Sequence, residues 1–217
     1  MSKKQKTVDH DMIPEPFKEE VRKLAKRKLP ERFYRALFRN LNEIRTAILE
    51  RKALIGLEST GSKHGLDFFK LSHLALYNDM TSRFVRVLDK DPASATFWYL
   101  RRSDQKNIDR FAKEKAYDLD KLNILADKLK KIRDKTLFHI DKKEGLVPRD
   151  VWEEADISHR EFGEALEQVF EILQYTRKIH SGKELAMPEY DGSDATKLVN
   201  AAQRDRIIPT FDNSNSS

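Results

Sequence analysis

The stretch that decides the fold spans residues 119–141, LDKLNILADKLKKIRDKTLFHID. Four apolar side chains in its first half recur at alternating spacings of three and four residues: Leu122, Leu125, Leu129 and Ile132. That spacing predicts an α-helix with one buried face, and Asp118 or Asp120 can cap its N-terminus. The next positions of the series are Thr136 and His139, so the predicted buried face becomes polar there.

Arg133, Asp134 and His139 bring together the side chains needed to cut a phosphodiester without a metal ion. The guanidinium of Arg133 presents a fixed fork that fits two phosphate oxygens. His139 can give and take a proton near neutral pH. On a straight helix these two side chains would lie about 120° apart, because each residue turns the helix by about 100°. They can serve one phosphate only if the helix ends before His139 or a second copy of the chain completes the site.

Lysines surround these three residues and are candidate contacts to an RNA backbone: Lys130, Lys131, Lys135, Lys142 and Lys143. A solvated helix face accounts for them equally well. The remaining histidines and carboxylates show no metal-binding spacing, and the chain contains no cysteine. We therefore predict neither a metal site nor a cofactor.

The composition indicates one mostly helical domain with tails. The chain has 217 residues, of which 36% are charged and 39% are hydrophobic, with only 7 Gly and 7 Pro. No apolar run is long enough to span a membrane, and the N-terminus lacks the apolar core of a signal peptide, so a cytoplasmic protein is expected. The net charge of +6 favours polyanionic partners, although 36 acidic residues are interspersed with the basic ones.

We expect an all-α fold, a helical bundle of four to five principal helices with flexible termini. Residues 1–30 form a basic lead-in, residues 31–181 the helical domain, and residues 182–217 a C-terminal extension. The extension is expected to contain a short helix over 194–206 and a disordered end over 212–217.

Within the helical domain, the apolar spacing and the turn residues predict further helices over 31–57, 66–88, 104–115 and 159–181. The second of these is apolar over a wide arc, which predicts a central place in the bundle. Residues 94–100 are either a short helix or a packed loop. Their aromatic residues Phe97, Trp98 and Tyr99 could stack on bases, but at this spacing they are more typical of a core. Ser158 and Glu161 form a capping box at the start of the last helix.

Residues 133–141, RDKTLFHID, resemble the signature of the HEPN superfamily: an arginine, a polar residue, a short spacer and a histidine. Residues 71–89, from LSHLALY to RVLD, resemble the helix that precedes this signature in the abortive-infection branch of AbiU-type proteins. The resemblance covers about residues 31–181.

The resemblance implies a helical homodimer in which two signatures line one cleft, and metal-independent cleavage of RNA in phage defence or as a toxin. By position, His139 would be the general acid or base, Arg133 would hold the scissile phosphate, and Asp134 would orient one of them. The ribose 2′-hydroxyl would attack its own phosphorus and leave a cyclic phosphate. RNA, a second copy of the chain and an antitoxin or regulatory protein are the implied partners.

Other interpretations of the same residues stay open. His139 can be a packed, hydrogen-bonded histidine, and Arg133 part of an ordinary charged helix end. Arg86 and Asp89 are most simply an ion pair, and His159 and His180 are expected at the surface of helix ends. The chain would then be a non-catalytic RNA- or protein-binding helical module, or a structural partner.

Overall fold

A computed structural model describes residues 29–58, 67–134 and 153–204. These residues contain α-helices and no β-strand, which confirms the expected all-α class. None of the helices is long and apolar enough to cross a membrane. The principal helices in this part of the chain are α2 (Glu31–Glu58), α3 (Asp67–Leu88), α4 (Phe97–Ser103), α5 (Gln105–Glu114), α6 (Leu119–Ile132), α8 (His159–Ser181) and α9 (Ser193–Arg204), and residues 153–155 are helical as well.

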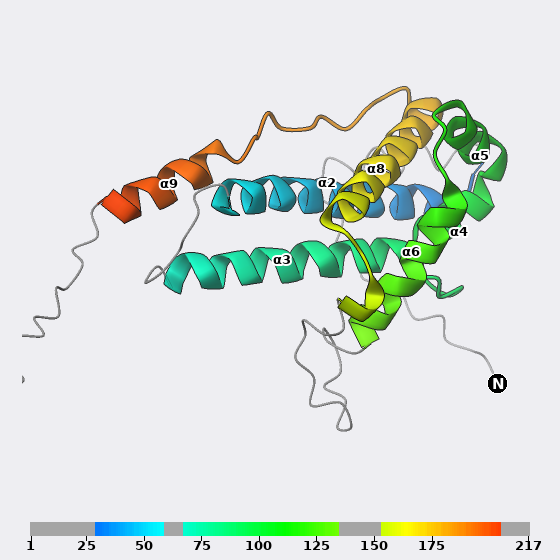
Figure 1. Ribbon diagram of the computed structural model, residues 1–217. Helices are drawn as coiled ribbons and strands as arrows, with labels where there is room; N and C mark the ends of the chain where they lie inside the picture. The colour runs from blue at the N-terminus through cyan, green and yellow to red at the C-terminus, as the bar shows by residue number, and fades with distance from the viewer. Residues whose placement is uncertain (1–28, 59–66, 135–152, 205–217) are drawn as a thin grey trace, which may run out of the picture.

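Helices α2 and α3 run alongside each other and form the long axis of the fold (Figure 1). Helix α8 crosses α2, the short helices α4 and α5 lie at one end, and α9 packs on α2 at the other end. The core fills the space between α2, α3, α6 and α8. Its largest buried side chains are aromatic and come from three helices: Phe33, Tyr34, Phe84 and Phe97.

The helix ends follow the signals in the sequence. Asp118 caps α6, because its Oδ1 accepts the backbone N–H groups of Asp120 and Lys121 at 3.0 Å each. Ser158 caps α8 by accepting the N–H of Glu161 at 3.0 Å. Gly182 ends α8 in the left-handed region with φ 73°, where a residue without Cβ is favoured. These three caps confirm the predicted start of α6 and both predicted ends of α8.

The predicted buried face of α6 is also confirmed. All four of its apolar residues are buried: Leu122, Leu125, Leu129 and Ile132. In the aromatic segment, Phe97 and Trp98 are buried and the indole N–H of Trp98 donates to the carbonyl oxygen of Leu88 at 2.9 Å. This segment is therefore a short helix that belongs to the core, as its spacing favours.

The predicted central place of α3 is wrong for its N-terminal half. All buried residues of α3 fall between Met80 and Leu88. In the first half, Phe68 is 74% exposed, Leu71 67% and Leu74 55%. Helices α8 and α9 pack against α2 instead, so no described helix covers the outer side of this half. The wide apolar arc of α3 thus includes a stripe that the described chain leaves open.

The C-terminal extension is anchored as far as Arg204. The amide of Gln174 donates to the carbonyl oxygen of Leu185 at 2.6 Å and accepts its N–H at 2.8 Å. Helix α9 lies close to α2, where Thr196 Oγ1 donates to the carbonyl oxygen of Gly56 at 2.9 Å. Residues 1–28 of the predicted basic lead-in and the predicted disordered end over 212–217 lie outside the described residues.

Candidate functional site

Arg133 lies directly after α6 and is held by two carboxylates. Its Nε donates to Asp134 Oδ1 at 2.8 Å, and its Nη1 donates to Asp89 Oδ2 at 2.9 Å. Asp89 follows the last residue of α3, and its other oxygen accepts the backbone N–H of Asp91 at 3.1 Å. The carboxylate of Asp89 is therefore fixed by a turn, and it fixes the orientation of the guanidinium.

The electrostatics of this cluster keep Arg133 charged. The hydrogen bond to Asp134 raises the pKa of Arg133, as do the negative charges of Asp134 and Asp89, against the opposing effect of partial burial. Among the described residues, Nη2 has no hydrogen-bond partner. One edge of the guanidinium thus retains donors that can meet a phosphate oxygen.

The other predicted site residues are only partly described. Lys130 and Lys131 are exposed in the last turn of α6. Helix α6 ends at Ile132, seven residues before His139, and Arg133 and Asp134 continue in a wider, π-helical turn. The geometry that relates Arg133 to His139 lies outside the described residues. The remaining candidates lie outside the described residues: Lys135, His139, Lys142 and Lys143.

A second charged cluster joins α2 to α3 around Arg83. Its guanidinium contacts three carboxylates: Asp79 at 2.8 Å, Glu43 at 3.0 Å and Glu50 at 3.3 Å. Arg86 also binds Glu43, at 3.0 Å. In place of the predicted pair of Arg86 with Asp89, Arg86 thus binds Glu43 of α2 and Asp89 binds Arg133 at the end of α6.

Glu50 is the most perturbed carboxyl group of this cluster. Burial is the main cause that raises its pKa to about 7, and the hydrogen bond and charge of Asp79 add to it. Hydrogen bonds with Glu50 and Arg83 lower the pKa of Asp79, against its partial burial. The two pKa shifts run in opposite directions, so Asp79 is the more readily ionised carboxyl group of the pair. Since Arg83 already binds each of these carboxylates, the cluster serves best as a tie between α2 and α3.

A small pocket of about 110 Å³ lies where α2, α3 and the start of α8 meet. Its apolar wall includes Leu54, Met80 and Phe162. Its polar side chains come from all three segments: Arg51, Glu58, Tyr77, Ser158 and His159. Side chains of three segments thus meet around accessible space at this pocket.

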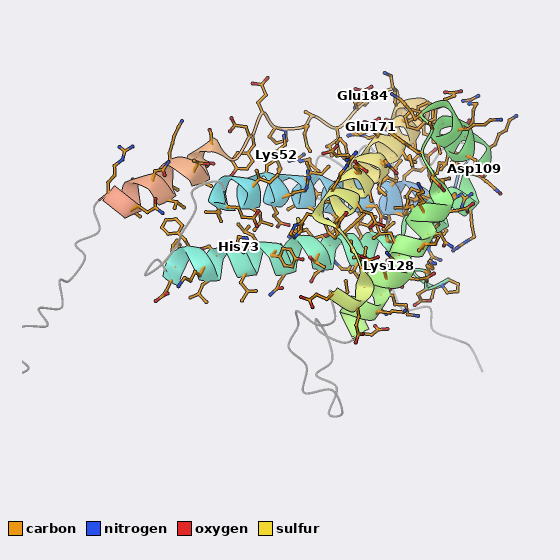
Figure 2. The ribbon with its side chains drawn as sticks, in the orientation of Figure 1. Lys52, His73, Asp109, Lys128, Glu171 and Glu184 are labelled. Carbon is orange, nitrogen blue, oxygen red and sulfur yellow. The ribbon has the colours of Figure 1, made fainter. Side chains whose placement is uncertain are left out.

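His73 engages the carboxylate at the rim of this pocket. It lies on the side of α3 that faces α2 (Figure 2), and its Nε2 is 2.7 Å from Glu58 Oε1. Burial raises the pKa of Tyr77 to about 12, and the charge of Glu58 acts in the same direction. The hydroxyl of Tyr77 is therefore protonated, and a hydrogen-bond donor, at neutral pH.

His180 departs from the expected surface position. Its Nε2 lies 2.7 Å from Asp104 Oδ2, and only 20% of its side chain is exposed. The ring packs edge-on against Phe33 and Tyr34 of α2, at centroid distances of 5.4 and 6.2 Å. His180 is in the last turn of α8 as predicted, but it is a packed histidine that joins α8 to the α4–α5 junction. His159 is exposed, as predicted.

Comparison of the chain with family models, with curated proteins and with solved structures yields no match. The part of the chain that the structure describes also holds no group of three or more metal-ligating side chains. The cluster around Arg133 and the pocket between α2, α3 and α8 are therefore the two candidate functional sites of the described structure.

The sequence does not single out Arg51, which lines the pocket, or Gly163, which lies beside it. It also predicts Arg86 as the partner of Asp89, whereas the structure has Arg133 there. One signal was present in the case of Gly163. A glycine inside an amphipathic helix costs about 1 kcal/mol relative to alanine, so it often marks a place where another group approaches the backbone. No comparable signal in the sequence links Asp89 to Arg133.

Proposed function

We propose that this chain is a metal-independent endoribonuclease of the HEPN type, acting in phage defence or as a toxin. The observation that carries the proposal is the arrangement around Arg133. A charged guanidinium lies at the end of α6, two carboxylates fix its orientation, and its Nη2 has no acceptor among the described residues. Exposed Lys130 and Lys131 precede it and add positive charge for an RNA backbone.

In the proposed reaction the 2′-hydroxyl of a ribose attacks the adjacent phosphorus. The bond from phosphorus to the 5′-oxygen of the next nucleotide breaks, and a 2′,3′-cyclic phosphate remains. His139 takes the proton of the 2′-hydroxyl or gives one to the leaving oxygen, which is worth about 10²- to 10⁴-fold in rate. Arg133 stabilises the charge on the phosphate oxygens, and Asp134 orients Arg133. The need for a 2′-hydroxyl restricts the reaction to RNA.

The proposed homodimer puts two such sites into one cleft, and the fold limits where its contact can form. The exposed stripe around Leu71 is eighteen residues before Asp89, or about 27 Å along a helix axis. A dimer formed only through that stripe would keep the two copies of Arg133 far apart. A shared cleft requires contact near Asp89 and the end of α6.

A second candidate function is a non-catalytic RNA- or protein-binding module. The same ion pairs favour it, because Arg133 already binds two carboxylates and so joins α6 to α3. In that case Arg133 is structural, and the lysines at the end of α6 provide the contact with a polyanion.

Digestion of a structured RNA pool that includes tRNA, with EDTA present, separates the two candidates. The native protein is compared with His139→Ala and Arg133→Ala, with Arg102→Ala as the matched control on an exposed arginine of α4. We expect cleavage with cyclic-phosphate ends for the native and control proteins, and a loss of about 10²-fold or more for the other two. Circular dichroism checks that each variant is folded.

Absence of cleavage by the native protein at any pH from roughly 6 to 8, the range for an imidazole acid or base, overturns the nuclease proposal. RNA affinity measured against salt then decides what is left. A linear fall of log affinity with log salt supports the RNA-binding module, and no binding points to a structural partner.

A further inference from the structure

The pocket between α2, α3 and α8 has a positively charged end that the proposed nuclease chemistry does not use. Arg51 lies across the first turns of α8, beside Gly163. A Cβ at position 163 would stand only 2.3 Å from Arg51 Nη2, so the guanidinium occupies the space that any other side chain would need. Glycine at this position lets Arg51 reach the pocket wall.

Arg51 has donor capacity to spare. Its hydrogen bond in the described structure goes to Glu167 at 3.4 Å, and the Glu167 side chain is 61% exposed. A long contact to an exposed carboxylate contributes little and is screened by salt. Helix α8 thus positions the guanidinium of Arg51, and this weak contact is the only hydrogen bond of its N–H groups among the described residues.

The start of α8 adds further donors beside Arg51. Ser158 caps the N–H of Glu161, which leaves the N–H groups of His159 and Arg160 without an acceptor inside the helix. His159 itself lines the pocket. An anion at this end would therefore meet the guanidinium, the imidazole and the positive end of the helix dipole together.

The opposite rim of the pocket limits the charge and the size of its ligand. Glu58 lines this rim and is engaged by His73 at 2.7 Å. A carboxylate this close disfavours a dianion such as a phosphate monoester more than a monoanion. The volume of about 110 Å³ is somewhat smaller than a 150 Å³ cavity that accepts benzene, so it limits the apolar group of the ligand to one ring or a short branched chain.

From these four features we infer that the pocket binds a small organic monocarboxylate, with its apolar group against Leu54, Met80 and Phe162 and its carboxylate on Arg51 and the start of α8. Binding there would tie the start of α8 to the middle of α3, where Tyr77 and Met80 line the pocket. The inference is independent of the proposed nuclease activity. Met80 lies nine residues before Asp89, about 14 Å along the helix, so the two sites are separate.

Benzoate is the probe, titrated into the full-length, isotopically labelled protein and followed by NMR. We expect saturable shifts at Gly163 and His159 with a Kd on the order of 1 mM, as suits a ligand of about nine heavy atoms. Benzyl alcohol tests the apolar part alone, acetate the carboxylate alone, and phenyl phosphate the dianion. Each of these is expected to bind at least about tenfold more weakly than benzoate.

The decisive variant is Gly163→Ala, which keeps every charge and displaces only the mobile end of Arg51. It should fold at least as well as the native protein, because alanine favours the helix, and should bind benzoate about tenfold more weakly. Lys178→Met is the matched control, since its side chain is 63% exposed in the last turn of α8 and does not line the pocket. Shifts that do not saturate, shifts confined to other residues, or equal binding of benzyl alcohol would each overturn the inference. Unchanged benzoate affinity in a folded Gly163→Ala would do so as well.

Discussion

Arg133 Nη1 lies 2.9 Å from Asp89 Oδ2, although 44 residues separate them in the chain. About a quarter of each side chain is exposed, so the pair is shielded from water more than a typical surface ion pair. The contact joins the residue after α3 to the residue after α6. This contact fixes the position of Arg133, the candidate catalytic arginine.

The first prediction concerns this pair. Asp89→Ala and Arg133→Ala should each destabilise the fold, and a double-mutant cycle should give a coupling energy of about 1 kcal/mol. Urea unfolding followed by circular dichroism measures it. The control is Asp127→Ala, which removes the partner of Lys90 in an exposed pair and should change stability by less than about 0.5 kcal/mol. A coupling energy near zero would mean that the Asp89 contact does not hold Arg133.

The second prediction concerns Glu50 and pH. Because the pKa of Glu50 is raised to about 7 from 4.5, the folded state binds its proton more tightly than the unfolded state. This contribution to stability is complete below about pH 4.5 and is lost as the pH rises through 7. At pH 8 the ionised group costs on the order of 3 kcal/mol, at about 1.4 kcal/mol per pKa unit.

Glu50→Gln removes that titration. Relative to the native protein, the variant should therefore gain stability as the pH is raised from 5 to 8, in urea unfolding at each pH. Glu164→Gln, in the exposed pair with Arg160, provides the comparison and should give a difference that is nearly independent of pH. A flat difference for Glu50→Gln would show that the carboxyl group has an ordinary pKa.

The third prediction concerns the contact of α9 with α2. A Cβ at position 56 would stand 2.2 Å from the carbonyl oxygen of Gly192, which is backbone and cannot move aside cheaply. Gly56→Ala should therefore release α9, with faster hydrogen exchange and faster proteolysis over Ser193–Arg204. Gly182→Ala is the comparison, because that position has φ 73° but open space around it. It should cost about 1 kcal/mol without exposing α9.

The fourth prediction concerns the cap of α6. Asp118→Ala removes an acceptor for two backbone N–H groups and should destabilise the protein by about 1 kcal/mol, within a range of about 0.5–2. Asp118→Asn keeps an acceptor oxygen and should recover most of the loss in thermal unfolding. If alanine and asparagine behaved alike, the side chain of Asp118 would have no capping role in solution.

The fifth prediction concerns the exposed stripe of α3. If the proposed shared cleft forms near Asp89, the double variant Phe68→Glu/Leu71→Glu should remain a dimer, because its charges lie at the other end of α3. Light scattering at micromolar concentration measures the molecular mass. A native dimer that becomes a monomer in this variant would place the contact on the stripe and contradict a cleft shared by two copies of Arg133.

Most of the described helices could be predicted from the sequence, because the signals that set them are local. The three-four spacing of Leu122, Leu125, Leu129 and Ile132 is enough to define a buried face. Asp118, Ser158 and Gly182 act on backbone groups within four residues of themselves. Such interactions depend little on the packing of the rest of the chain, so they can be predicted directly from the sequence.

The candidate site was predicted only in part. The chemistry of Arg133 and Asp134 follows from their residue types and their adjacency, whereas the geometry that relates them to His139 stays a prediction. Arg83, with its three carboxylate partners, shows the same limit. Its charge is plain in the sequence, but which acids surround it depends on how α2 and α3 align.

The sequence by itself determined the helical class, the start of α6, both ends of α8 and the residue types at the candidate site. Only the tertiary structure decided that Asp89 binds Arg133, that Arg51 lies over Gly163, and that half of α3 stays exposed. The physical reason is the range of the interactions. Spacing and capping act within a turn or two of one helix, while these three results depend on which helix faces meet across the fold.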